Sequence, residues 1–392
     1  MGISNLDTLN PLISKNQNIQ DISKLIYEPL FYLTNDYKLE NALAIECSKT
    51  AINSYLVKLR ENVKWHNGNS FIAADVKYTI EQIQKLGSDY IYYANVQNIE
   101  SVEVISDSIL RINVLEEKPF FEYDLTFPII CMTFFGIEDI SVSQKSNIPM
   151  GTGIYKLQSV DINSQIELKI NDNWWNITNK KPKLEKVNIK IFSSQSEVYN
   201  AYKLGSIDLL CTRNNSNIEK NIGTIGYNIK ELYGREYDYL ALNCSSDVLS
   251  NKEIRQALKY AIDKQRIINE IYNGKYFEAD YPLSYGSYLY NSSNSNYEFN
   301  QEKSKKILQD NEWNYTNKNW QKKIGNNTVK IKIKLLVNSL NENRVKAANI
   351  IKENLESIGI PVSIISVKDN AYNNYVTNKN YDLFFTGITV RN

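Results

Sequence analysis

Short β-rich segments alternate with amphipathic helical segments along almost the whole chain, and this alternation is what most constrains its fold. Residues 54–59 place Tyr55, Val57 and Leu59 on one face, a spacing typical of a half-buried strand. Residues 73–86 instead carry apolar side chains at helical spacing. The longest apolar runs are about six to eight residues, which suits buried strands and is too short to cross a membrane. We therefore predict an α/β (mixed α+β) fold.

The same reading predicts the remaining elements. A helix from Ile19 should be closed by Pro29. Ser250 and Glu253 have the spacing of a capping box at the start of another helix. A strand, a helix and a strand in the order 186–192, 197–205 and 207–211 favour a parallel crossover. Further strands are expected within 102–115, 154–160, 165–171, 330–337, 361–367 and 381–390, and further helices within 247–274 and 342–359.

The charged residues nearly cancel, with 45 Lys and Arg against 44 Asp and Glu in 392 residues. This balance gives no global basic field, so we expect no nucleic-acid partner. A local charged patch is compatible with the balance and has to be sought on the folded surface. The cysteines are far apart and show no Cys-x-x-Cys spacing, which gives a structural zinc site no support. We expect free, mostly buried thiols at Cys47, Cys131, Cys211 and Cys244.

The sequence offers little for catalysis. Its single histidine, His66, is expected at a turn, and one histidine does not build a histidine-based triad or a His-rich metal site. The Gly-Thr-Gly at 151–153 is too short to cradle a diphosphate and predicts a tight turn or hinge. A glycosidase-like pair of carboxylates stays open among the 44 available. Four tryptophans either offer stacking platforms or pack in the core: Trp174, Trp175, Trp313 and Trp320.

A series of motifs runs in order along nearly the whole chain: LDTLNPL, LIYEPLF, LRENVKWHNGNSFIAADVKYTIE, MGTGIYKL, LGSIDLL, LALNCS, EIRQALKYAIDKQRI and YDLFFTG. In this order they resemble the family 5 extracellular solute-binding proteins, which serve oligopeptide, dipeptide and nickel importers. Each motif alone is weak, and the ordered set is strong. One departure is Ile154, which stands where the family usually has proline.

The resemblance implies a two-lobed clamp of the periplasmic-binding-protein type II, with an extra inserted domain. Domain I would comprise residues 1–42 and 150–236, domain II the insert 43–149, and domain III residues 237–392. The ligand would lie between domains I and III. His66 would then be a marker of the inserted domain and not a ligand-binding residue.

Such a clamp binds an extended peptide as an added strand, with main-chain hydrogen bonds supplying affinity and roomy pockets accepting side chains. Position along the chain then gives a set of candidate ligand-binding residues. For each tyrosine among them, surface packing is the alternative. The candidates are Ser14, Lys15, Asn16, Tyr90, Tyr92, Tyr93, Tyr233, Arg235, Tyr237, Tyr239, Asn243, Gly387, Ile388 and Thr389.

The resemblance further implies the substrate-binding component of an ABC importer, which takes a short peptide and passes it to membrane permease subunits. We expect a monomer, no cofactor, no metal and no enzymatic activity. The start MGISNLDTLNP shows no signal peptide, which indicates either a cytoplasmic protein or a trimmed targeting segment. The resemblance favours the second reading and, with it, a lipid-anchored protein at a Gram-positive cell surface.

The end of the sequence departs from the family, which usually continues beyond the motif at ITVRN. We therefore expect domain III to be incomplete at its C-terminus. Oligopeptide binders often hold the ligand amine with an aspartate just after the YDL strand, where this chain has Val390, Arg391 and Asn392. Other readings stay open: a truncated or orphan clamp for a nickel chelate or sugar, a chaperone-like or sensory protein, and a carbohydrate-active enzyme.

Overall fold

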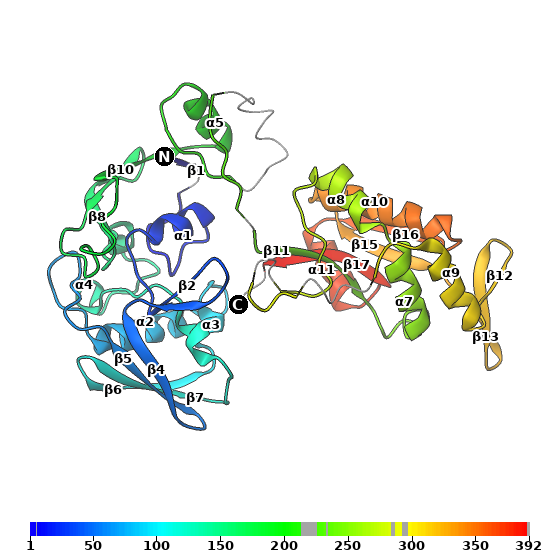
Figure 1. The fold of residues 1–392 in the computed structure, drawn as a ribbon, viewed down its shortest axis with the longest axis horizontal. Helices are drawn as coiled ribbons and strands as arrows, with labels where there is room; N and C mark the ends of the chain where they lie inside the picture. Colours follow the sequence, from blue (N-terminus) through cyan, green and yellow to red (C-terminus); the bar gives the residue numbers. More distant parts are fainter. Residues whose placement is uncertain (5, 213–225, 233, 284–286, 292–296, 390–392) are drawn as a thin grey trace. The chain divides into compact units, whose positions relative to one another are not determined.

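The chain folds as two compact units, residues 1–226 and 227–392, here called unit 1 and unit 2. The structure is a computed structural model that describes residues 1–4, 6–212, 226–232, 234–283, 287–291 and 297–389. Both units combine sheets with helices, which confirms the predicted mixed α/β class (Figure 1). The finer division into three domains stays a prediction.

Two four-stranded sheets form the framework of unit 1, in the orders β1-β10-β9-β8 and β4-β5-β7-β6. Strand β1 runs parallel to β10, and all other neighbours in these sheets are antiparallel. A short antiparallel ladder joins β2 to β3. The strands are β1 (Gly2–Ser4), β2 (Phe31–Leu33), β3 (Leu39–Asn41), β4 (Ala44–Ala51), β5 (Ser54–Leu59), β6 (Ile99–Ser106), β7 (Ile109–Val114), β8 (Tyr155–Asp161), β9 (Gln165–Ile170) and β10 (Lys186–Phe192).

Helix α2 (Ala73–Leu86) of unit 1 matches its predicted span, because local signals fix both of its ends. The Asp75 carboxylate accepts the Ile72 backbone N–H at 3.0 Å, and Gly87 ends the helix at a φ of 84°. The helix expected to reach Pro29 is shorter and ends at Ser23. The other helices of unit 1 are α1 (Gln17–Ser23), α3 (Tyr93–Val96), α4 (Met132–Phe135) and α5 (Gln195–Lys203), with 3₁₀ turns at Phe121–Leu125 and Gln144–Asn147.

His66 lies in a turn, as predicted, and this turn is docked on the Gly-Thr-Gly segment. The His66 backbone N–H donates to the Gly151 carbonyl at 2.9 Å, and its Nε2 lies 3.0 Å from the Gly153 carbonyl. Its Nδ1 accepts the Gly151 N–H at 3.4 Å. A Cβ on Gly151 would lie 1.9 Å from the Ile26 carbonyl oxygen. The glycines therefore permit close backbone approach, in a segment where the chain bends at residues 152–154.

Unit 2 is built on a four-stranded sheet in the order β11-β17-β15-β16. Strand β17 runs antiparallel to β11 and parallel to β15, and β15 runs parallel to β16. The β15-α10-β16 segment is the predicted strand–helix–strand unit. The elements of this sheet and its connecting helix are β11 (Glu236–Leu242), β15 (Ile333–Asn338), α10 (Glu342–Ser357), β16 (Val362–Val367) and β17 (Leu383–Thr389).

Among the described residues, the remaining elements of unit 2 are four helices and a small sheet of order β12-β13-β14. Trp313 and Trp320 are 1% and 3% exposed in the unit 2 core, and Trp174 is buried in unit 1. For these three tryptophans the packing alternative is confirmed. The elements are α7 (Lys252–Ala261), α8 (Lys264–Tyr272), α9 (Gln301–Asp310), α11 (Asp369–Thr377), β12 (Asn314–Thr316), β13 (Asn319–Ile324) and β14 (Asn327–Lys330).

Two local predictions are wrong. Residues 207–211 form no strand and are largely exposed, and β1 takes the place of parallel neighbour to β10. Ser250 does not cap α7, because Asn251 occupies the N-cap position and the Ser250 hydroxyl donates to the Asp247 carbonyl. In both cases another segment or residue occupies the predicted position: β1 lies beside β10, and Asn251 is the N-cap of α7.

The four cysteines are free thiols, as predicted, but they are not mostly buried. Only Cys131 is buried, and Cys47 is half-buried, whereas Cys211 and Cys244 are exposed. Burial raises the pKa of the Cys47 thiol to about 12, so this sulfur stays protonated at neutral pH. Within the described residues, no helix combines the length and hydrophobicity needed to span a bilayer.

Candidate functional site

The loop before α1 holds the first group of candidate residues in unit 1. The Asp7 carboxylate accepts the Ser14 hydroxyl and the Lys15 backbone N–H, both at 2.7 Å. Asn16 caps α1 and donates its amide N–H to the Ser4 carbonyl at 3.0 Å. The side chains of Ser14 and Asn16 therefore shape the loop, whereas the Lys15 side chain is exposed.

The predicted tyrosine loop lies against this first loop. The Lys15 amine lies 5.6 Å from the centroid of the Tyr90 ring, within the range of a cation–π contact. The Tyr92 hydroxyl donates to the Gln20 side-chain oxygen at 2.8 Å. The Gln20 amide in turn donates to the Ser14 carbonyl at 3.0 Å. The structure thus brings together two candidate segments that are more than seventy residues apart (72 for Tyr92 and Gln20).

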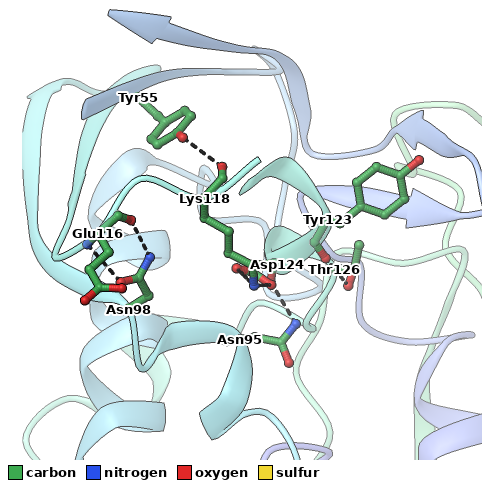
Figure 2. A network of polar contacts seen from close by, with 8 residues as sticks. All are labelled: Tyr55, Asn95, Asn98, Glu116, Lys118, Tyr123, Asp124 and Thr126. Carbon is green, nitrogen blue, oxygen red and sulfur yellow. Dashed lines mark hydrogen bonds and ion pairs between the residues drawn. The ribbon is translucent and has the colours of Figure 1, made fainter. Parts of the chain in front are cut away.

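The position of the tyrosine loop is fixed by α3, which begins at Tyr93. Figure 2 shows the polar network that anchors this short helix. The Asn95 amide donates to the Asp124 carbonyl at 2.9 Å, and the Lys118 amine pairs with the Asp124 carboxylate at 2.6 Å. The Tyr55 hydroxyl, on β5, donates to the Lys118 carbonyl at 3.0 Å. Burial raises the pKa of Asp124, and the Lys118 ammonium opposes that rise.

The second group of candidates lies on β11 and β17 in unit 2. The Tyr237 and Tyr239 rings stack with centroids 5.6 Å apart and planes inclined by 23°. Tyr237 is paired across the ladder with Ile388, which is 46% exposed. Alternation along the strands places these three side chains on one face of the sheet. The result is a partly exposed apolar and aromatic surface.

The opposite face of β11 is held by a partly buried ion pair. The Arg344 guanidinium donates to the Asp238 carboxylate at 2.6 Å, and the Tyr272 hydroxyl donates to its other oxygen at 2.8 Å. A Cβ on Gly387 would lie 2.1 Å from Asp238 Oδ1, which explains why glycine stands there. Burial, reinforced by the Asp238 carboxylate, raises the pKa of Tyr272 and keeps this donor protonated.

The remaining candidates are placed as follows. Arg235 is exposed just before β11. The Asn243 amide donates to the Lys379 and Tyr381 carbonyls at 3.2 and 3.0 Å, so it closes the β11–β17 ladder. Thr389 is the backbone partner of Glu236 at the other end of that ladder. Candidate Tyr233 and the residues considered for the amine anchor, Val390, Arg391 and Asn392, lie outside the described residues.

A buried polar cluster around Glu28 in unit 1, here called the Glu28 node, was not predicted from the sequence. Glu28 is 1% exposed and accepts hydrogen bonds from Tyr32 and Thr152 at 2.8 Å. The indole N–H groups of Trp174 and Trp175 donate to it at 3.0 and 3.1 Å. Burial raises the pKa of Glu28, although the four donors favour the carboxylate. Because every hydrogen-bond partner of Glu28 donates, the geometry fits the ionised carboxylate. The sequence signal that could have marked this residue is the glutamate of the LIYEPLF motif.

An arginine completes this node. The Arg60 guanidinium carbon lies 3.9 Å from the Trp175 ring centroid, and its Nε donates to the Ala42 carbonyl at 2.9 Å. The cation stacked on the indole accounts for the half-buried position of Trp175. Within the part of the chain that the structure describes, no three His, Cys, Asp or Glu side chains are grouped to hold a metal ion.

Comparison with known proteins gives a consistent family. The model described as bacterial extracellular solute-binding proteins, family 5 Middle, matches residues 39–392. Oligopeptide-binding protein AppA of Bacillus subtilis (strain 168) is 23% identical over an alignment 401 residues long, which covers 95% of this chain and 69% of AppA. The dipeptide-binding protein of Escherichia coli (strain K12) is 24% identical over 279 residues, which span 66% of this chain and only 52% of that protein.

A solved structure shares the fold of this chain. The structure of HbpA2 from Haemophilus parasuis aligns with 99% of this chain and 79% of that chain, with a TM-score of 0.82 and 21% sequence identity. The TM-score shows a shared fold over essentially the whole sequence given. The predicted fold class is thereby confirmed.

Proposed function

The chain belongs to the family 5 bacterial extracellular solute-binding proteins, and from this premise we propose that it captures short peptides outside the cell for an ABC importer. It delivers them to the permease subunits of that importer and performs no chemistry on them. It acts as a monomer, held at the cell surface by a lipid anchor. The names of relatives such as the oligopeptide-binding AppA and the dipeptide-binding protein support peptides as the ligand class.

The observation that carries the proposal is the edge position of β11. In the sheet order β11-β17-β15-β16, this strand pairs with β17 over seven residues, and no other described strand pairs with it. An extended peptide bound along the other edge of β11 satisfies backbone donors and acceptors regardless of its sequence. The stacked rings of Tyr237 and Tyr239 beside this edge give flat apolar contact area at low entropic cost.

Unit 1 supplies groups of complementary chemistry. The exposed Lys15 ammonium, next to the Tyr90 ring, offers a positive charge for a peptide carboxylate. The Tyr92 hydroxyl is held by Gln20, and its half-buried ring packs against the core of unit 1, which fixes the tyrosine loop beside Lys15. Charge for a terminus and aromatic area for side chains are what a receptor for varied short peptides requires.

The proposal is tested by thermal unfolding of the purified chain with a diverse mixture of short peptides, together with mass spectrometry of small molecules released on denaturation. Peptides should raise the melting temperature, and they should leave the incubation chemically unchanged. A flat melting response across the mixture would refute peptide capture. Release of a nickel chelate or a sugar, or consumption of a glycoside, would favour the corresponding alternative reading.

A pair of variants tests the site itself. Replacing Tyr237 and Tyr239 together by alanine removes both stacked rings and should raise the peptide Kd about tenfold, since each aromatic contact contributes about 0.5–1.5 kcal/mol. Phe299→Ala removes an exposed aromatic side chain of unit 2 outside β11 and serves as the control. Equal weakening by both variants would show that β11 does not hold the ligand.

A further inference from the structure

The segment 314–334 concentrates positive charge in a chain whose formal net charge is only +1. It contains six lysines and neither aspartate nor glutamate. Residues 314–330 of this segment form the small sheet β12-β13-β14 of unit 2. Peptide capture at β11 makes no use of this sheet, so its charge calls for a separate explanation.

One face of the small sheet is fixed to the core of unit 2. The Trp320 indole N–H donates to the Ile358 carbonyl at 2.7 Å, just beyond the end of α10. Val329 packs against the same core. Tyr315 lies over Gly359, where a Cβ would come within 2.2 Å of its ring. The sheet is therefore a fixed platform with a defined outer face.

The outer face carries the lysines. In the β13–β14 ladder, Gln321 is paired with Lys330, and Lys323 with Thr328, so these four side chains share a face. The exposed lysines of the segment continue on either side, beyond the buried Ile331 and at the β12–β13 turn. We define the lysine patch as Lys318, Lys323, Lys330 and Lys332, all of which are exposed.

The lysine patch is not neutralised by neighbouring carboxylates. No ion pair joins a patch lysine to an acidic group among the described residues. The acidic side chains at the ends of the adjoining helices have partners of their own: Glu312 with Lys322, Asp310 with Lys306, and Glu356 with Lys352. The patch therefore presents a local positive potential that the near-zero net charge conceals.

We propose that the lysine patch is a contact surface for a bilayer that carries anionic phospholipid headgroups. Lysine provides a strongly hydrated point charge, which suits a diffuse array of phosphates better than one shaped anion. The face that bears Lys323 and Lys330 otherwise carries uncharged polar side chains, and it lacks the aromatic and arginine anchors that centre protein–protein interfaces. These side chains are Asn314, Thr316, Asn319, Gln321 and Thr328. Charge complementarity with a flat anionic surface is the chemistry that this face can satisfy.

The size of the effect follows from the number of charges. Each lysine near an anionic membrane strengthens adsorption by about fivefold at low ionic strength. Loss of three patch lysines should therefore weaken adsorption by about a hundredfold, and added salt should weaken the adsorption of the parent chain as the Debye length falls to about 10 Å near 0.1 M. This membrane contact does not depend on peptide capture, because the patch and β11 lie in different sheets.

The experiment is co-sedimentation of the full chain with vesicles of phosphatidylcholine alone or mixed with phosphatidylglycerol in a ratio of roughly three to one. The test variant combines Lys323→Gln, Lys330→Gln and Lys332→Gln. The matched control combines Lys180→Gln, Lys181→Gln and Lys183→Gln, which removes the same charge from three exposed lysines of unit 1. Both variants should melt like the parent chain, because all six side chains are exposed.

Binding to the anionic vesicles alone, lost in the test variant and kept in the control, is the expected result. Equal loss in both variants would mean that net charge and not the patch drives adsorption, and it would overturn the proposal. The proposal is also overturned if the parent chain does not bind anionic vesicles at low salt, or if it binds both vesicle types equally.

Discussion

Acidification should destabilise unit 1 through its single histidine. Burial holds the pKa of His66 at about 4, below the usual 6.5, because the poorly solvated turn disfavours the charged imidazolium; the Gly153 carbonyl opposes this shift, and the Lys156 charge adds to it. The unfolded chain takes up a proton near pH 6.5, and the folded chain does so only near pH 4. Between these values the unfolded state binds more protons, so stability falls as the pH falls.

The magnitude follows from the width of that window. A difference from 6.5 to about 4 spans roughly 2.5 pH units, and each unit corresponds to about 1.4 kcal/mol. The free energy of unfolding should therefore drop by about 3 kcal/mol between neutral pH and pH 4 on account of His66. Buried carboxylates with raised pKa values, such as Glu28 and Asp75, act in the opposite direction over part of this range.

Comparison with His66→Gln isolates the contribution of the imidazole. Glutamine retains a donor for the Gly153 carbonyl but does not titrate, and the carboxylates are common to both proteins. Urea unfolding followed by tryptophan fluorescence, repeated across the pH range, should show the parent chain losing about 3 kcal/mol more than the variant. NMR of the single imidazole gives its pKa directly. A measured pKa near 6.5, or parallel stability curves, would refute the reasoning.

Two further substitutions test the close contacts of each unit. Gly151→Ala places a methyl group against the Ile26 carbonyl oxygen and should cost about 2 kcal/mol or more in urea unfolding, whereas Gly234→Ala, with no atom within 4 Å of its Cβ, should cost less than about 0.5 kcal/mol. Arg344→Met leaves the Asp238 carboxylate without its cation and should destabilise unit 2 by about 2–3 kcal/mol, with part of the loss restored by adding Asp238→Asn. Strictly additive costs in that double variant would show that the pair does not interact.

Helices and strands were predicted well from the sequence where the residues that mark their two ends lie within a few positions of those ends. Helix α2 is the clearest example, because Asp75 and Gly87 mark its ends and its apolar stripe marks its buried face. The strand expected at 207–211 failed for the opposite reason. Its apolar residues resemble a buried strand, but the position beside β10 is taken by β1, which begins at Gly2.

The candidate site could likewise be predicted only as far as local sequence patterns reach. Motif order selected Lys15, Tyr90 and Tyr237 as ligand-binding candidates; their side chains lie on exposed or partly exposed surfaces, and their role in binding stays a prediction. Contacts between distant segments, such as Tyr92 with Gln20, depend on tertiary packing that no local spacing encodes. The Asp238–Arg344 pair was missed because charged residues on strands and helices are usually solvated, and nothing in the sequence marks this pair as partly buried.

The node at Glu28 bears on how the chain is made at the ribosome. The carboxylate is synthesised early, but its indole donors at Trp174 and Trp175 follow 146 and 147 residues later. At a synthesis rate of about 5–20 residues per second, the interval between the synthesis of Glu28 and that of its indole donors is on the order of ten seconds. Throughout that interval the nascent chain cannot bury Glu28 without an unsatisfied charge. The Glu28 carboxylate therefore acquires its full set of donors only after residues 174 and 175 have been made.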